Sequence, residues 1–241
     1  MIAKDAARRR IFLMRHGSVT YFDADGRPHP PDTVPLNAQG RDQADAAGRL
    51  FADANIRFDR VIVSGLARTV ETAERVLAAS GQSISLQHDN HLREIGGGKL
   101  SDIPDAELQQ AFVGAMDGVV SLDTRFLGGE TVGELMDRVM PRVDALRADA
   151  EWDIVLLVLH GGVNRAVLSY LLTGQRQFIG GLAQAPACVN AIDVGAGRHD
   201  VAVRLINHAP LDQLHTTTRK TTMEALYEQY VKFRKGKTHV L

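Results

Sequence analysis

The sequence predicts an α/β fold, a three-layer α/β/α sandwich around a mainly parallel central sheet. Apolar, β-branched segments alternate along most of the chain with segments of helical periodicity, which is the pattern of layered α/β domains. The segments 11–14 and 153–160 are apolar almost throughout, as strands buried on both faces are. With 241 residues, 44% of them hydrophobic, the chain has ample material for a large core. We expect residues 1–241 to form a single domain, with a flexible N-terminus over 1–10.

Strands and helices are expected to alternate until two strands follow each other near the C-terminal end. The strands are expected over the apolar segments 11–14, 60–64, 84–87, 153–160, 189–194 and 201–206. The helices are expected over the amphipathic segments 37–54, 68–80, 131–150, 163–173 and 221–233. Segment 153–160 gives the strongest strand signal and is expected at the centre of the sheet. The last two strands flank a glycine-rich turn, which predicts a hairpin or an edge pair.

Capping residues indicate where several helices begin and end. Asn37 is a suitable N-cap for the first helix, and Thr131 with Glu134 forms a capping box for a later one. Gly174 offers the left-handed residue that ends the helix before it. Pro141 lies inside the helix that starts at the capping box, so we expect that helix to be kinked or split.

Two long irregular segments are expected to carry function, because long loops in compact domains usually do. Residues 18–35 are rich in proline and aspartate. Residues 96–129 contain glycine clusters, and we expect them to form a lid over the site. Apolar side chains in this lid favour a partly hydrophobic leaving group, unless they pack on the core: Phe112, Met116, Phe126 and Leu127.

Composition excludes several classes of protein. Lys and Arg total 28 against 29 Asp and Glu, so no global basic field exists to hold nucleic acid or an anionic membrane. Cys188 is the only cysteine, which excludes an intramolecular disulfide. The longest apolar run, Ile154–Leu159, is far shorter than the roughly 20 residues of a membrane-spanning helix. No apolar signal-peptide segment follows the basic N-terminus, so we expect a cytoplasmic protein.

Charged and titratable residues follow three of the expected strands. Arg15 and His16 come after the first strand, Arg68 lies shortly after the second, and His160 ends segment 153–160. The carboxyl ends of parallel strands meet at one edge of a sheet, so these groups are expected to converge. Arginine forks match phosphoryl oxygens, histidines change charge near neutral pH, and Glu94 is the best candidate for an accompanying acid. Any one of them alone is more often a structural or surface residue.

Five ordered motifs between Ile11 and Ile206 resemble those of a known family. They are FLMRHGS, VPLNAQGRDQA, VIVSGLARTVETAERV, LREIGGG and VLLVLHGGVNRAVL. Together they are similar to the motifs of the histidine phosphatase superfamily, also called the phosphoglycerate mutase-like family. The resemblance implies the phosphoglycerate mutase-like form of the α/β/α sandwich.

The resemblance also implies roles for individual residues. His16 would be the nucleophile that forms a phosphohistidine, and Glu94 would protonate the leaving oxygen. Arg15, Arg68 and a protonated His160 would surround the phosphoryl oxygens, with Gly161 also at the phosphate. No cofactor and no metal are expected, because positioning and positive charge serve phosphoryl transfer here.

The chain departs from the family pattern at two positions. Gly65 stands where a proline is common, although Arg68 stays in register. Phe22 stands where many members, the mutases among them, have an asparagine that helps bind phosphate. Ser18 lies where the family has several polar residues, and we place Ser18 and Phe22 among the residues expected to face substrate.

Other signals are weaker. His88 and His91 have a spacing that a metal could use, but no third ligand is evident, so we expect no metal site. The basic residues near the C-terminal end suit the end of a helix and are read as structural: Lys232, Arg234, Lys235 and Lys237.

The expected function is hydrolysis of a small-molecule phosphomonoester. One alternative is a phosphoglycerate mutase, which uses the same histidine but returns the phosphoryl group to phosphoglycerate. Another is a non-catalytic module that only binds a phosphorylated ligand. Phe22 favours the phosphatase. The sequence names neither the substrate nor the oligomeric state, and a homodimer stays an open alternative.

Overall fold

The computed structural model describes residues 8–238, with the exception of residues 24 and 26. Its larger sheet has six strands in the order β3-β2-β5-β1-β7-β8. The strands of this sheet are β1 (Arg9–Arg15), β2 (Arg60–Val63), β3 (Leu86–His88), β5 (Ile154–Leu159), β7 (Val189–Val194) and β8 (Val201–His208). Neighbours among β3, β2, β5 and β1 pair in parallel. Strand β7 pairs antiparallel with β1 on one side and with β8 on the other. This confirms the mainly parallel sheet and the terminal strand pair.

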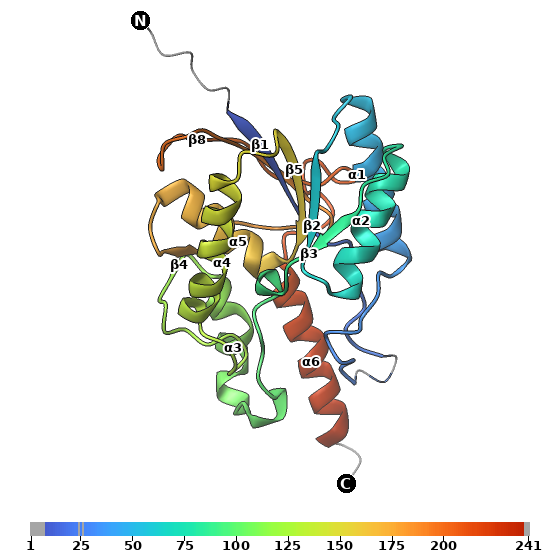
Figure 1. Cartoon of the computed structure of the whole chain (residues 1–241). Coiled ribbons are helices and arrows are strands. Elements are labelled where there is room, and N and C mark those ends of the chain that lie inside the picture. The colour runs from blue at the N-terminus through green and yellow to red at the C-terminus, as the bar shows by residue number, and fades with distance from the viewer. Residues whose placement is uncertain (1–7, 24, 26, 239–241) are drawn as a thin grey trace, which may run out of the picture.

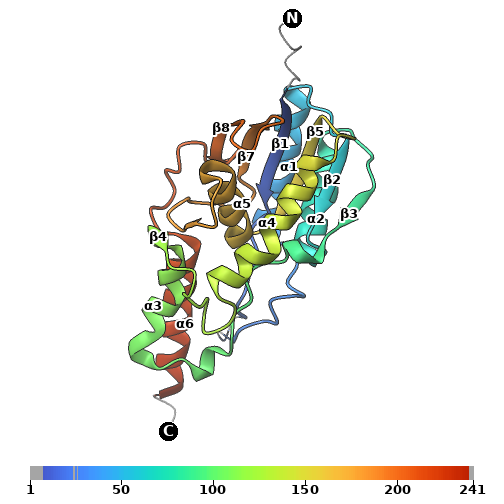
Figure 2. The same cartoon turned by 60° about the vertical axis from the view of Figure 1, so that its left-hand side comes forward.

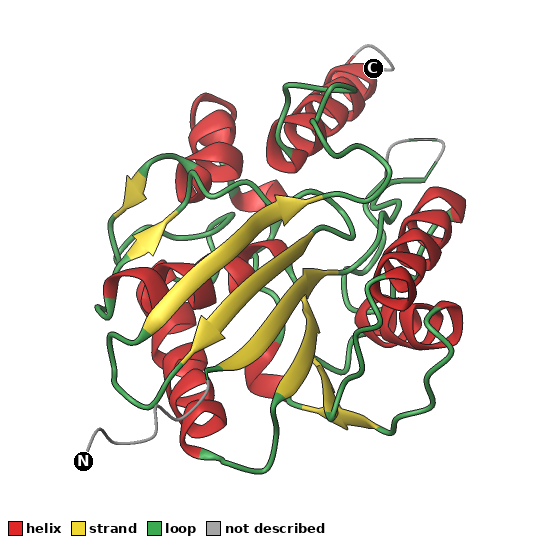
Figure 3. Ribbon diagram, turned by 90° about the horizontal axis from the view of Figure 1, so that it is seen from above, coloured by secondary structure: helices red, strands yellow, loops and turns green. Residues whose placement is uncertain are grey.

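Helices cover both faces of this sheet, which confirms the three-layer α/β fold (Figure 1, Figure 3). The helices are α1 (Ala38–Asp53), α2 (Ala67–Ala79), α3 (Leu108–Val113), α4 (Val132–Ala148), α5 (Gly161–Thr173) and α6 (Thr222–Thr238). Helices α1 and α2 lie on one face, and α4 and α5 lie on the other (Figure 1). No helix in the described part of the chain is both long and apolar enough to cross a bilayer.

Alternating side chains of the central strands build two separate cores. In β1, Ile11 and Leu13 pack in the core shared with α4 and α5, while Phe12 and Met14 pack in the core shared with α1 and α2. Successive side chains of a strand point to opposite faces, so a strand between two helical layers must be apolar on both. This is the physical reason that the central strands have no polar alternation.

The predicted helix caps are present. The Asn37 side chain accepts a hydrogen bond from Gly40 N at the start of α1, and Thr131 and Glu134 form the capping box of α4. Helix α4 runs without a break through Pro141, so a split at this residue was a wrong expectation. Pro141 lies on the exposed face of α4, where water can bind the carbonyl that loses its helical partner.

The N-terminal boundary also differs from expectation. Strand β1 begins at Arg9, so the end of the segment expected to be flexible is part of the sheet. Arg10 forms an ion pair with Asp193 of β7, at 2.6 Å. Residues 1–7 lie outside the described part of the chain.

The segment 90–129 is irregular, as predicted, and contains one element that the sequence did not indicate. It consists mostly of short 3₁₀ turns at Asn90–Leu92, Leu100–Asp102, Asp105–Glu107 and Gly114–Met116, together with α3. Strand β4 (Val119–Val120) pairs with β6 (Phe178–Ile179) in a separate two-stranded sheet. Strands of two residues are too short to show a period.

Helix α6 lies beside α3, beyond the carboxyl ends of the parallel strands (Figure 1, Figure 2). Its Tyr230 ring packs on Phe112 of α3, with ring centroids 5.7 Å apart, and on Phe22, at 6.4 Å. Phe22 belongs to the irregular segment 18–35, which we call the first loop. Arg234 of α6 forms an ion pair with Asp105 at 2.9 Å. We call Phe22, Phe112 and Tyr230 the aromatic cluster.

The apolar residues of the expected lid are therefore mostly engaged in packing. Phe112 is buried in the aromatic cluster, and Phe126 is buried in the core beside α4 and α5. Met116 and Leu127 are half-buried and pack against that core as well. These apolar residues are therefore explained by packing within the protein, and they no longer argue for a hydrophobic leaving group.

Close backbone contact between α1 and the segment after β1 should make Gly40 essential for stability. A Cβ atom at Gly40 would overlap the backbone of Ser18, so Gly40→Ala is expected to lower the free energy of unfolding by about 2 kcal/mol. At the exposed Gly181 the nearest atom to an added Cβ is 3.8 Å away, so Gly181→Ala is the matched control. Urea unfolding of both variants checks this, and equal midpoints would contradict it.

Candidate active site

The predicted charged and titratable residues meet at the carboxyl edge of the parallel strands. Arg15 ends β1, His16 follows it, and Arg68 lies in the first turn of α2. His160 is the residue before α5. Strand β5 lies between β1 and β2, so His160 lies between the residues that follow these two strands. The ring centroids of His16 and His160 are 5.3 Å apart. All four side chains are at least nine-tenths buried.

Glycine permits the tight turn after β1. The N–H of Gly17 donates to Thr72 Oγ1 of α2 at 3.1 Å, and a Cβ atom at Gly17 would overlap the carbonyl oxygen of Gly40. The segment after β1 is thus fixed between α1 and α2. This packing holds the backbone of His16 beside Arg68.

The imidazole of His16 is oriented by its own neighbour. Its Nδ1 lies 2.7 Å from the carbonyl oxygen of Gly17, which can only accept, so Nδ1 carries the proton and Nε2 has a free lone pair. Burial holds the pKa of His16 well below its usual value, and the positive charges of Arg15 and Arg68 lower it further. His16 is therefore neutral and nucleophilic at Nε2.

A chain of hydroxyl groups fixes the tautomer of His160. Thr69 Oγ1 donates to the carbonyl oxygen of Leu66 at 2.8 Å, so it can only accept from Ser64 Oγ, 3.1 Å away. Ser64 Oγ therefore donates its hydrogen bond to Thr69 and accepts one from His160 Nε2, at 2.7 Å. The free lone pair of neutral His160 is consequently on Nδ1, which is buried and has no hydrogen-bond partner among the described residues.

The pKa of His160 is lowered in the same way as that of His16. Burial is the main cause that holds the pKa of His160 well below its usual value, and His16, Arg68 and Arg15 lower it further. The lowered pKa favours the neutral ring, and the protonated His160 that the resemblance implies beside a phosphoryl group stays a prediction. A bound anion next to Nδ1 would favour the protonated form.

Both arginines use one nitrogen for the protein and leave another free. Arg15 Nη1 donates to the carbonyl oxygen of Gln184 at 2.6 Å and to Thr222 Oγ1 at 2.9 Å. Arg68 Nη1 donates to the carbonyl oxygen of Pro31 at 2.6 Å. The Nε atoms of both side chains are buried and have no hydrogen-bond partner in the described part of the chain. Buried donors without partners are rare, so these atoms indicate an anion site.

The carboxyl group of Glu94 lies at the start of α5, the helix that directly follows His160. Its Oε1 accepts from Gly162 N at 3.0 Å, and a Cβ atom at Gly162 would lie 2.6 Å from this oxygen. Arg138 of α4 holds the loop that carries Glu94, donating to the backbone oxygens of Arg93 at 2.7 Å and Glu94 at 3.2 Å. The glycine after the expected phosphate residue Gly161 therefore makes room for the carboxyl group.

Arg165 is a charged residue of this region that sequence reasoning missed. It is buried, and its Nη1 donates to the carbonyl oxygen of Gly161 at 3.0 Å. Burial lowers the pKa of Arg165 to about 10, and the nearby Arg15 contributes to this shift. The available signal was its position one helical turn after Gly161, on the same face of α5.

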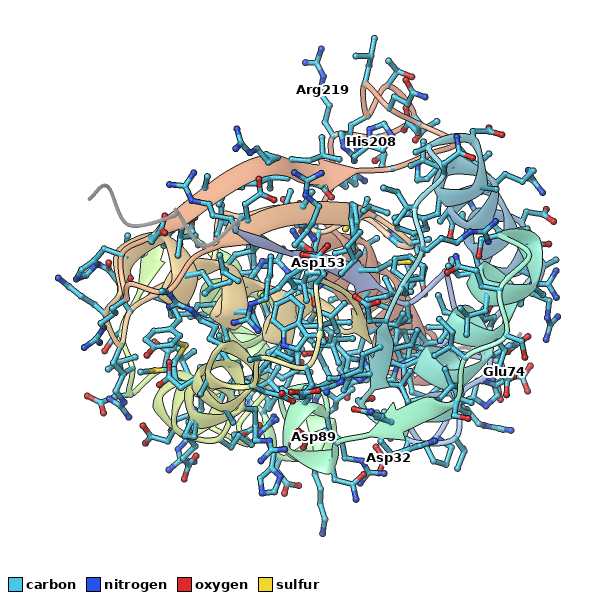
Figure 4. All side chains as sticks on the ribbon, turned by 45° about the horizontal axis from the view of Figure 1, so that its top comes forward. Asp32, Glu74, Asp89, Asp153, His208 and Arg219 are labelled. Atoms are coloured by element: carbon cyan, nitrogen blue, oxygen red, sulfur yellow. The ribbon has the colours of Figure 1, made fainter. Side chains whose placement is uncertain are left out.

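Ser18 and Phe22, both expected to face substrate, have contacts within the protein. Ser18 Oγ is 3.3 Å from Asn37 Nδ2 at the start of α1, and Phe22 belongs to the aromatic cluster. Asp32 of the same first loop lies at the surface, 3.8 Å from Arg93 (Figure 4). The part of Ser18 and Phe22 in substrate binding stays a prediction.

The pair His88 and His91 shows no further metal ligand. His91 Nδ1 lies 3.2 Å from Asp89, and Arg142 also contacts this carboxylate, at 2.6 Å. Within the described residues, no three His, Cys, Asp or Glu side chains are grouped so that they could hold a metal ion.

Comparison with known proteins gives the chain a family. Residues 11–207 match the Histidine phosphatase superfamily (branch 1). A relative from Salmonella paratyphi A named "Probable phosphoglycerate mutase GpmB" is 32% identical over 165 residues, which are 68% of this chain and 74% of the relative.

Solved structures share the fold at lower identity. A mycobacterial glucosyl-3-phosphoglycerate phosphatase has a TM-score of 0.65 at 24% identity, over 83% of this chain and 98% of the other. A phosphoglycerate mutase from Bacillus anthracis has a TM-score of 0.62 at 21% identity, over 84% of this chain and 94% of the other. The ordered motifs, the buried site and the match over residues 11–207 agree, and the chain belongs to the histidine phosphatase superfamily, branch 1.

Proposed function

We propose that this protein is a phosphatase that hydrolyses a small-molecule phosphomonoester through a phosphohistidine at His16. The observation that carries the proposal is the set of three unpartnered buried nitrogens beside His16: Arg15 Nε, Arg68 Nε and His160 Nδ1. A tetrahedral phosphoryl group offers oxygen acceptors to several donors at once, and its negative charge matches two guanidinium groups.

The reaction would take place in two steps. The Nε2 lone pair of His16 attacks phosphorus, the bond to the ester oxygen breaks, and the carboxyl group of Glu94 gives its proton to that oxygen. Water then attacks the phosphohistidine, the P–N bond breaks, and the Glu94 carboxylate takes the proton from the water. The arginines stabilise the charge of the transferring group in both steps. No step needs a cofactor or a metal.

Phe22 favours hydrolysis over phosphoryl transfer to a second substrate. Many family members have an asparagine at this position that contacts phosphate, whereas the Phe22 ring of this chain packs on Tyr230. A site with fewer contacts to phosphate retains the phosphoryl intermediate less well against water. This supports the phosphatase. The mutase stays a second candidate, because the Salmonella relative carries that name at 32% identity.

Covalent labelling tests the nucleophile. Brief incubation with a ³²P-labelled phosphomonoester followed by acid-free quenching should label His16, because a neutral imidazole with a free Nε2 is the attacking group. His16→Ala is expected to lose the label and at least about 1,000-fold of the activity. His88→Ala, which changes an exposed histidine outside the site, is the matched control. Label that persists in His16→Ala would refute the proposal.

Binding of a tetrahedral dianion should take up a proton at His160. Its Nδ1 lone pair faces an anion unfavourably until it is protonated, so anion binding raises the low pKa of this ring. Above the free-state pKa, sulfate affinity should fall with rising pH, by up to about tenfold per unit for one linked proton. Sulfate does not titrate between pH 5 and about 9, so calorimetry across this range reports the protein group.

His160→Asn is the informative variant for this linkage. It removes the titrating nitrogen, so the pH dependence of sulfate binding should become nearly flat. A slope that survives in His160→Asn would place the proton on another group and contradict the assignment.

Parallel assays separate phosphatase from mutase. Release of inorganic phosphate and interconversion of phosphoglycerates are measured on the same enzyme, over a panel of sugar phosphates, phosphoglycerates, nucleotides and phosphopeptides. We expect phosphate release to exceed interconversion on every substrate that reacts. Faster interconversion of phosphoglycerates would favour the mutase.

A further inference from the structure

Helix α6 brings a hydroxyl group to the phosphate arginine from outside the family match. The match ends at residue 207, and Thr222 is the first residue of α6. Thr222 Oγ1 accepts a hydrogen bond from Arg15 Nη1 at 2.9 Å. The second partner of the same nitrogen, at 2.6 Å, is the carbonyl oxygen of Gln184. Both hydrogens of Arg15 Nη1 therefore have acceptors within the protein.

Other arginines of this chain show what remains free on Arg15. Three of them hold a carboxylate through Nε and Nη2, which lie on the same edge of the guanidinium group: Arg10, Arg138 and Arg176. In Arg15 and Arg68, the Nη1 atom is bound to the protein and the Nε atom is unpartnered. Both phosphate arginines thus present the edge that elsewhere in this molecule binds an anion through two hydrogen bonds.

We propose that Thr222 is a positioning residue that fixes the Arg15 guanidinium with its Nε–Nη2 edge toward the phosphoryl group. The inference deepens the phosphoryl site proposed above and rests on that site. Arginine has a long side chain with several rotatable bonds, and two acceptors on Nη1 fix the plane of the fork before an anion arrives. Binding then requires less ordering of the side chain.

The hydroxyl of Thr222 is available for this role because a neighbour caps the helix. Thr221 Oγ1 accepts from Glu224 N at 3.2 Å, and Thr221 N donates to the Glu224 carboxylate at 2.6 Å. These two bonds form the N-terminal cap of α6 without Thr222. A change at Thr222 can therefore remove the contact with Arg15 and leave the cap intact.

Packing away from the site sets the place of Thr222. Tyr230 holds α6 against Phe112 and Phe22, and Arg234 holds it against Asp105. One helix thereby joins the first loop, the segment 96–129 and Arg15.

The test measures anion binding in the full-length chain, with Thr222→Val, Thr222→Ser and Thr222→Ala compared with the parent. Valine keeps the shape and removes the acceptor, so the Kd for inorganic phosphate, measured by calorimetry at constant pH, should rise about tenfold. Serine restores the acceptor and should bring the Kd to within about twofold of the parent. Thr173→Val, which removes a hydroxyl bond at the far end of α5, is the matched control and should not change the Kd.

Unfolding by urea is measured on each variant. If Thr222→Val proves unfolded, Thr222→Ala, which also lacks the acceptor and adds no new contact, takes its place with the same tenfold expectation. Parent-like phosphate binding by the hydroxyl-free variant overturns the proposal. The proposal is also overturned if Thr222→Ser binds phosphate as weakly as Thr222→Val, because the loss would then follow from side-chain size and not from the missing acceptor.

The readout separates this inference from the proposed function. Phosphate binding that weakens tenfold in Thr222→Val supports the positioning role even if His16 takes no label. If His16 is labelled and the enzyme is active, but Thr222→Val binds phosphate as tightly as the parent, the proposed function stands and the positioning role of Thr222 is refuted.

Discussion

Arg15, Arg68 and Arg165 are each more than nine-tenths buried at one edge of the sheet, and none of them belongs to an ion pair in the described part of the chain. Isolated charges in a protein interior cost several kcal/mol each unless hydrogen bonds or a counter-ion compensate for lost water. Backbone carbonyl oxygens compensate in part, through Gln184, Pro31 and Gly180. The remaining positive potential favours the binding of an anion. Burial lowers the pKa of both neighbouring histidines, and this positive charge lowers it further.

The sheet topology creates this concentration of charge. Because β5 lies between β1 and β2, the residues that follow these three strands lie side by side at one edge of the sheet, although they are far apart in sequence. The helical layers then seal the region from both sides, and glycines at positions 17 and 40 let α1 approach the strand exit closely. The site is thus a product of strand order and close packing, since few of its side chains hold one another directly.

Sequence patterns were sufficient for the strands of the larger sheet, for the helix caps and for the charged residues at the strand ends, because each of these has a local signal. Residues 154–159 are apolar without interruption, Thr131 and Glu134 are three residues apart, and Arg15 is adjacent to His16. The contact between Arg15 and Thr222 has no such signal, because the two residues are 207 positions apart in the sequence. The burial of Phe112 beneath Tyr230 is equally non-local. The sequence around Phe112 indicates an irregular segment, but it contains no signal for the contact with Tyr230.

Helix α6 has one more consequence, which concerns the order in which the chain is made. A ribosome releases β1, β2 and β5 before α6, so the sheet and its strand exits can form while Arg15 and Phe22 still lack their partners on this helix. Nascent chains fold from the N-terminal side as they emerge. From the emergence of β5 and His160 onward, the growing polypeptide therefore carries an unfinished pocket, and the pocket gains its outer wall only when translation has passed the codons for α6.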